Sequence, residues 1–175
     1  KHKGFELVAD AIHDIMGMDV QMIVLGTGDW NFEEAFRQAQ NQYPGRFAAH
    51  MMYSPNLSTA IYGGADLFLM PSISEPCGLS QMIAMRYGTI PVVRETGGLR
   101  DSVVPYNRLS NEGTGFSFAN INAHEMTGVL AAAVDLYHSD KQAWKALQHN
   151  AMTADFSWTR SAAAYCEIYS WVTGK

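Results

Sequence analysis

A carboxylate and a thiol stand two positions apart in the chain, at Glu75 and Cys77. An apolar run typical of a strand ends just before them at Met70, and the apolar spacing of a helix begins at Leu79. A turn from a strand into a helix presents free backbone N–H groups and the positive end of a helix dipole. Gly78 lets a ligand approach this backbone closely. These features favour an anionic ligand, above all a phosphate.

Each candidate residue also has an ordinary structural interpretation, which the sequence leaves open. A glutamate before a helix can be stabilised by the helix dipole alone, and a single cysteine is often a small buried hydrophobe. Tyr53 is compatible with a half-buried core aromatic, and Lys3 with a solvated surface lysine. The glycines of Gly26-Thr27-Gly28 can simply close a turn, because a GxG pair without its third glycine is weak evidence.

The predicted elements alternate between helix and strand over the first two thirds of the chain. Apolar spacing predicts helices at 5–16, 32–39, 55–64 and 79–87, and strands at 20–25, 46–53, 66–70 and 90–93. Asn31 with Glu34 resembles a capping box for the second helix, and Ser54 before Pro55 is typical of a helix start. This alternation is typical of βαβ units on a parallel sheet.

After residue 115 the pattern changes to a short strand at 116–118 and three consecutive helices. Their predicted N-caps are Asn122, Asp140 and Ser157. We therefore expect an α/β fold with a doubly wound, Rossmann-like parallel sheet and a helical C-terminal tail. Residues 1–175 would form a single domain, with a βαβ core at 1–120 and C-terminal helices at 121–175.

The composition narrows the classes of function. The chain has 175 residues, 47% of them hydrophobic, which is enough for one domain with a substantial core. A net charge of −5 disfavours nucleic-acid or anionic-membrane partners. Two cysteines and ten methionines suit a reducing, cytoplasmic protein. The six histidines are scattered without metal-ligand spacing, so we expect no metal site.

The unusual residues follow the ends of the predicted strands. In an open parallel sheet, ligands bind outside the carboxyl ends of the strands. The segments at these ends are Gly26–Gly28, Tyr53, Glu75–Gly78 and Arg94–Gly98. We expect these four loops to form one binding edge.

Five short motifs occur in an order that resembles a known family. They are "KGFEL" at 3–7, "LGTGD" at 25–29, "GGAD" at 63–66, "PSISEPCGLSQ" at 71–81 and "RETGGLRDSV" at 94–103. The series resembles the carboxyl-terminal domain of bacterial glycogen synthases and plant starch synthases, retaining glucosyltransferases with the two-domain GT-B fold. "DFSW" at 155–158 is also similar to the bacterial enzymes, so the resemblance covers almost the whole chain.

The resemblance implies a donor site for ADP-glucose. Lys3 matches a lysine that contacts the donor diphosphate, and Tyr53 matches an aromatic near the adenine. Glu75 matches the acid that contacts the transferred glucose, and Cys77 lies beside the sugar. Lys3 and Glu75 would be the catalytic residues.

The resemblance further implies that backbone N–H groups of Gly78, Leu79 and Ser80 receive the distal phosphate. The reaction would transfer glucose, with retention, to an α-1,4-glucan without a metal or other cofactor. The family's arginine upstream of the lysine is absent from this chain. So is the amino-terminal domain that binds the glucan acceptor, and the chain begins without Met, so we expect a piece of a longer protein.

Two other functions fit the same sequence. One is a sugar-nucleotide-binding module without turnover of its own. The other is a different GT-B enzyme, such as a glucosyltransferase that uses UDP-glucose or a glucan phosphorylase. A phosphorylase requires a lysine placed for a pyridoxal Schiff base, and no suitable motif is evident in the sequence.

Overall fold

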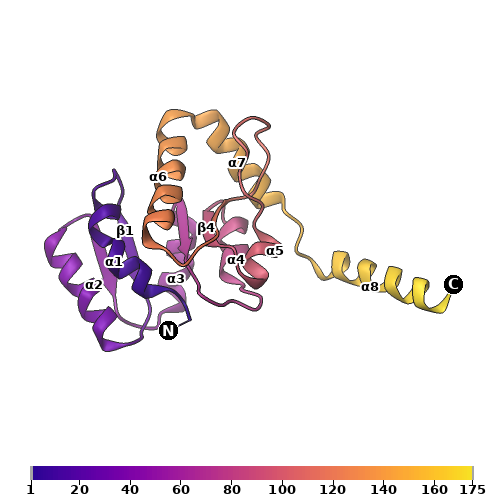
Figure 1. The fold of residues 1–175 in the computed structure, drawn as a ribbon, viewed down its shortest axis with the longest axis horizontal. Coiled ribbons are helices and arrows are strands. Elements are labelled where there is room, and N and C mark those ends of the chain that lie inside the picture. The colour runs from indigo at the N-terminus through magenta and orange to yellow at the C-terminus, as the bar shows by residue number, and fades with distance from the viewer. Residues whose placement is uncertain (1, 175) are drawn as a thin grey trace.

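The computed structural model describes residues 2–174, which form eight helices and five strands (Figure 1). The helices are α1 (Phe5–Met16), α2 (Trp30–Gln42), α3 (Pro55–Gly64), α4 (Ser80–Arg86), α5 (Gly97–Ser102), α6 (Ala123–Ser139), α7 (Lys141–Thr153) and α8 (Trp158–Thr173). The strands are β1 (Met22–Leu25), β2 (Phe47–His50), β3 (Leu67–Met70), β4 (Ile90–Arg94) and β5 (Phe116–Phe118). Every predicted element is present, and α5 is an additional helix that the sequence did not predict; it begins within the loop predicted at 94–98.

All five strands pair in parallel, in two separately hydrogen-bonded sheets. β1 pairs with β2 in one sheet, and β4 lies between β3 and β5 in the other. Because paired parallel strands end at the same edge of a sheet, the loops after β3 and β4 lie close together. The predicted parallel α/β architecture is confirmed, although its hydrogen bonds form two sheets rather than one.

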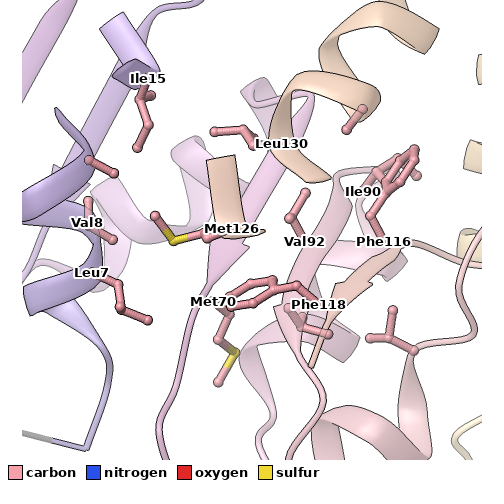
Figure 2. Packing of buried hydrophobic residues seen from close by; sticks show 14 of the residues in the cluster. Leu7, Val8, Ile15, Met70, Ile90, Val92, Phe116, Phe118, Met126 and Leu130 are labelled. Carbon is pink, nitrogen blue, oxygen red and sulfur yellow. The ribbon is translucent and has the colours of Figure 1, made fainter. Parts of the chain in front are cut away.

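The main core lies between α1, α6 and the three-stranded sheet (Figure 2). Met126 of α6 is fully buried between the side chains of α1 and those of the sheet. The residues that meet here come from α1, α6, β4 and β5: Leu7, Val8, Ile15, Met126, Leu130, Val92 and Phe118. This packing fixes the start of α1 relative to the ends of the strands, which is where the candidate site lies.

Side-chain caps begin most of the helices as the sequence predicted. The predicted caps each accept a hydrogen bond from a backbone N–H group three residues further along: Ser54, Asn122, Asp140 and Ser157. The capping box predicted at Asn31 and Glu34 is wrong. Helix α2 begins two residues earlier than that box requires, at Trp30, and its N-cap is Asp29, whose Oδ1 accepts from the N–H group of Asn31 at 3.0 Å.

Helix α8 stands apart from the rest of the described chain (Figure 1). All residues from 155 to 174 are exposed, including Trp158 and Trp171, each at 84% of full exposure. The predicted helical tail is therefore present, and it makes no contribution to the core described above. Of the helices within residues 2–174, none has both the length and the apolar character needed to cross a bilayer.

Candidate functional site

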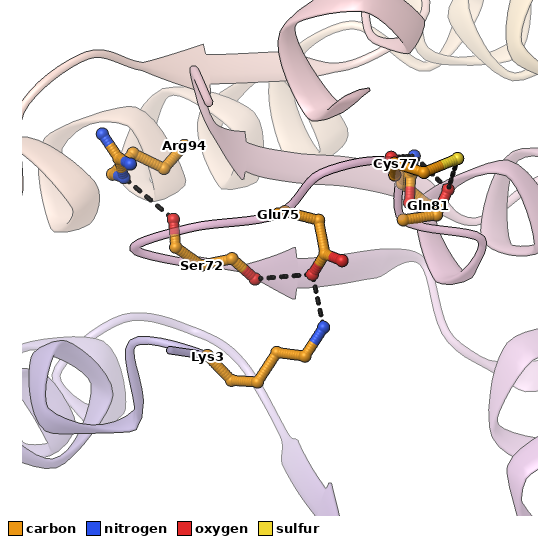
Figure 3. Close-up of polar contacts among 7 residues, drawn as sticks. Lys3, Ser72, Glu75, Cys77, Gln81 and Arg94 are labelled. Carbon is orange, nitrogen blue, oxygen red and sulfur yellow. Dashed lines mark hydrogen bonds and ion pairs between the residues drawn. The ribbon is translucent and has the colours of Figure 1, made fainter. Parts of the chain in front are cut away.

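An ion pair joins the start of α1 to the loop after β3 (Figure 3). Lys3 Nζ donates a hydrogen bond to Glu75 Oε2, and Ser72 Oγ donates to the same oxygen at 3.3 Å. The Glu75 side chain is only 10% exposed, whereas that of Lys3 is 55% exposed. A buried carboxylate needs such partners, since an unpaired buried charge is strongly unfavourable. The ammonium group of Lys3 has three N–H donors, so it can hold Glu75 and still contact a ligand from the solvent side.

The backbone around Gly4 brings Lys3 to this position. Gly4 has a φ of 70°, in the left-handed region that favours glycine. It also touches Pro71: a β-carbon on Gly4 would lie 1.9 Å from the Pro71 carbonyl oxygen. The carbonyl oxygen of His2 accepts a hydrogen bond from the N–H group of Ile73 at 2.9 Å. The segment before α1 is thus fixed directly on the loop that carries Glu75.

Arg94, at the end of β4, supports the loop from the other side (Figure 3). Its guanidinium donates to the carbonyl oxygens of Ser72 at 2.8 Å, Ile73, and Ala119 at 3.2 Å. The sequence predicted Arg94 only as part of a binding loop. Its side chain instead binds the backbone of the loop that carries Glu75, and the sequence pattern did not indicate this role.

Helix α5 holds the turn that follows Glu75. The N–H group of Gly98 donates to the carbonyl oxygens of Glu75 at 3.1 Å and Pro76 at 3.2 Å. A β-carbon on Gly97 would lie 2.2 Å from the Glu75 oxygen, and one on Gly98 would lie 2.0 Å from the Cys77 oxygen. Two successive glycines are therefore needed for this close backbone approach.

The structure gathers the predicted residues from Glu75 to Ser80 into one turn. Cys77 and Leu79 are exposed, and Gly78 has a φ of 74°. Within residues 2–174, the backbone N–H groups of Gly78 and Leu79 have no hydrogen-bond acceptor. The turn therefore presents a thiol and two free amides beside the Lys3–Glu75 ion pair.

Tyr53 lies at a neighbouring cavity instead of against this turn. The cavity has a volume of about 410 Å³. Its lining residues include Gly26 after β1, Tyr53 after β2, Ile83 of α4 and Tyr87, which directly follows α4. Tyr53 is 88% exposed, which excludes the alternative of a half-buried core aromatic. Because α4 lines this cavity and also follows directly from the turn at 75–80, the two features are adjacent parts of one edge.

The loop after β1 is closed by a side chain of α2. Glu33 Oε1 accepts a hydrogen bond from the N–H group of Gly28 at 3.0 Å, and Arg37 donates to Glu33 Oε2 at 2.9 Å. The Gly28 N–H group, followed by Arg37, lowers the pKa of Glu33 below its usual value. Gly28 thus has the turn-closing role that was one interpretation of the sequence, and its N–H group is not free for a ligand.

The described part of the chain has no cluster of acidic, histidine and cysteine side chains that would form a metal site. Within residues 2–174, no group of three or more of them is arranged to hold a metal ion. The charged groups that do meet at the strand ends are Lys3 and Glu75.

Parallel strands followed by an ion pair, free amides and an aromatic-lined cavity define an α/β ligand-binding domain. The chain belongs to the family of glycosyl transferases group 1, whose family model matches residues 1–151. The predicted GT-B resemblance is thereby confirmed at the level of the family and the fold.

Bacterial glycogen synthases are among the most similar curated proteins. The chain is 48% identical over 169 residues to that of Desulfitobacterium hafniense, covering 97% of this chain and 36% of that protein. It is 52% identical over 167 residues to that of Geobacillus thermodenitrificans, covering 95% of this chain and 34% of that protein. The chain therefore spans about a third of the length of these relatives.

A solved structure of the same kind shares the fold closely. It is the catalytic domain of starch synthase IV from Arabidopsis thaliana, bound to ADP and acarbose. The two are 34% identical, with a TM-score of 0.84 over 99% of this chain and 36% of that chain.

Proposed function

We propose that this chain is the donor-binding domain of a glycogen or starch synthase that transfers glucose from ADP-glucose to the non-reducing 4-OH of an α-1,4-glucan, with retention. The observation that carries the proposal is the Lys3–Glu75 ion pair beside the free amides of Gly78 and Leu79. The similarity to glycogen synthases and to an ADP-bound starch synthase supports the choice of donor and reaction.

Lys3 and Glu75 would act on the bond that breaks. As the glucose C1–oxygen bond breaks, its electron pair leaves with ADP, and negative charge grows on the departing phosphate. Lys3 is half exposed and retains N–H donors beyond its bond to Glu75, so it can stabilise that charge. Glu75, held by Lys3 and Ser72, would orient the glucose and stabilise the positive character that develops at C1.

The remaining predicted residues would bind the donor along the same edge. Tyr53 and its cavity of about 410 Å³ would receive the adenine. The N–H groups of Gly78, Leu79 and Ser80 would receive the distal phosphate, and the exposed Cys77 would lie beside the sugar. We assign these roles to the core at residues 1–120. Of the helices at 121–175, α6 and α7 pack on this core and α8 stands apart from it.

The glucan acceptor would bind mainly to an amino-terminal domain of the complete protein, outside this chain. ADP-glucose would be the donor substrate, and we propose no metal or further cofactor. The predicted surroundings are the cytoplasm, without nucleic-acid or membrane partners. A net charge of −5 supports the absence of nucleic-acid partners.

The test is transfer of labelled glucose to glycogen by the full-length protein, with ADP-glucose and UDP-glucose compared as donors. We expect incorporation from ADP-glucose and an α-linked product that α-1,4-specific hydrolysis releases. Tight nucleotide binding without incorporation would support a non-catalytic binding module, and a clear preference for UDP-glucose would identify another member of the family.

A further inference from the structure

The side chain of Gln81, at the second residue of α4, lies fully buried beneath the turn that carries the free amides (Figure 3). Its Nε2 donates to the carbonyl oxygens of Cys77 at 3.2 Å and Gly78 at 2.9 Å. The same nitrogen lies 3.0 Å from Ser102 Oγ of α5. The Gln81 amide therefore binds two successive carbonyl groups of the turn from the buried side.

These two contacts decide where the N–H groups of the turn point. In a trans peptide, the C=O and N–H groups of one unit point in opposite directions. The Cys77 carbonyl shares its unit with the Gly78 N–H group, and the Gly78 carbonyl shares its unit with that of Leu79. Because Gln81 holds both carbonyls inward, both N–H groups point outward, where no acceptor is found among the residues described.

Ser102 connects this arrangement to the loop of Glu75. Ser102 Oγ donates to the Gly98 carbonyl oxygen at 2.6 Å, so toward the Gln81 amide it acts as an acceptor. It shares the two hydrogens of Nε2 with the Cys77 and Gly78 carbonyl oxygens. Gly98 in turn donates its N–H group to the carbonyl oxygen of Glu75. One continuous set of hydrogen bonds therefore fixes both the amides of the turn and the residue that precedes them.

We propose that Gln81 is a positioning residue that aims the Gly78 and Leu79 amides at the distal phosphate of a nucleoside diphosphate. This inference rests on the proposed function, which supplies the phosphate ligand. Gln81 does not touch the ligand itself, because its side chain is fully buried and its Nε2 is already bonded to the protein. Its Oε1 has no partner among residues 2–174, so the nitrogen of the amide is the group that acts.

The test compares ADP with AMP, which lacks the distal phosphate, in the full-length protein. Gln81→Met keeps the approximate length of the side chain and removes its N–H donors. We expect it to weaken ADP binding about 10-fold, the low end for a hydrogen bond to a charged group, and to leave AMP binding unchanged. Isothermal titration gives both dissociation constants, and circular dichroism reports the melting temperature.

Two further variants separate positioning from general stability. Gln148→Met is the matched control, because Gln148 Nε2 also donates to a glycine carbonyl at 2.9 Å, at Gly88, away from the turn. It should leave the ratio of ADP to AMP affinity unchanged. Ser102→Ala removes one contact of the Gln81 amide and should lower the same ratio by a smaller factor. If Gln81→Met fails to fold, the ratio of ADP to AMP affinity in Ser102→Ala tests the positioning role of Gln81 instead.

The outcomes distinguish this inference from the proposed function. Suppose that ADP still binds and that the ratio of ADP to AMP affinity is the same in wild type, Gln81→Met and Ser102→Ala. That result would overturn the positioning role of Gln81 but not the proposed function. Equal weakening of both nucleotides would also overturn it, since that is the effect of a merely structural residue. A wild-type protein that binds neither nucleotide would overturn the proposed function and this inference with it.

Discussion

Gly4 and Pro71 touch backbone to backbone where the first helix meets the loop after β3, and no side chain fits between them. This contact sets the distance between Lys3 and Glu75. Because Gly4 also has a φ of 70°, an alanine there would have both a strained backbone conformation and a steric clash with Pro71. We expect Gly4→Ala to lower the free energy of unfolding by about 2–5 kcal/mol, the sum of a left-handed backbone and an overpacked contact.

The control for Gly4→Ala is Gly45→Ala. Gly45 has a φ of 74°, but a β-carbon there meets nothing within 4 Å. It should cost only about 1–2 kcal/mol, the backbone contribution alone. Denaturant unfolding of both variants measures the difference, and equal losses would show that the approach of Gly4 to Pro71 does not constrain the fold.

Glu75 and Lys3 should respond differently to neutral substitutions in the full-length protein. Glu75→Gln is expected to lower kcat by about 10²–10³, or 2.7–4 kcal/mol, with little change in KM for ADP-glucose, because its charge matters most in the transition state. Lys3→Gln should raise KM and lower kcat, since Lys3 would also hold the diphosphate in the ground state. Steady-state kinetics with varied ADP-glucose separate these effects.

Glu112→Gln and Lys145→Gln are the matched controls, since both residues are exposed and lie outside the candidate site. Neither should change kcat or KM. If the Glu75→Gln variant kept a near-normal kcat, the carboxylate of Glu75 would have only a structural role, which is to hold Lys3 and the start of α1.

The two thiols provide an internal comparison for ligand binding. Cys77 lies exposed in the turn, and Cys166 lies on α8. ADP-glucose at about 100 times its Kd should slow alkylation of Cys77 about 100-fold, because only the free form reacts. The rate at Cys166 should not change. Mass spectrometry of quenched samples gives both rates, and protection of neither thiol would place the ligand away from the turn.

Acid should weaken the connection between β5 and α6. Glu125 accepts hydrogen bonds from the N–H groups of Ala119 at 2.8 Å and Asn120 at 3.1 Å. The bond from Ala119 is the main cause that lowers the pKa of Glu125 below its usual 4.5. A lowered carboxyl pKa stabilises the fold fully above the unfolded value, and the gain is lost as pH falls through the folded value.

Glu125→Gln should therefore be less stable than wild type near neutral pH, and the difference should shrink as pH falls below about 4.5. Asn122→Ala removes the neutral cap of the same helix and should cost about 1 kcal/mol at every pH. Urea unfolding at a series of pH values tests both. A difference for Glu125→Gln that stayed constant with pH would contradict the assigned cause.

The sequence alone determined the order and type of most elements. Apolar spacing predicted α1, and short polar side chains before apolar runs marked the starts of α3, α6, α7 and α8. These signals are local: a cap bonds a backbone group three residues away, and a helix face repeats every three or four residues. The motifs at the strand ends also indicated the family, because they combine residue types that one strand-to-helix turn requires.

Only the tertiary structure decided how the site is held together. Lys3 and Glu75 form an ion pair although they stand 72 positions apart in the chain. Arg94 and Gln81 bind carbonyl groups of the loop between β3 and α4, and nothing in the sequence of that loop indicates these contacts. The role of the two glycines that begin α5 likewise depends on an approach by the Glu75 loop. The Lys3–Glu75 pair joins segments far apart in the chain, and the other contacts each end on a backbone carbonyl, a group that every residue has. Residue types therefore cannot specify these contacts until packing brings the segments together.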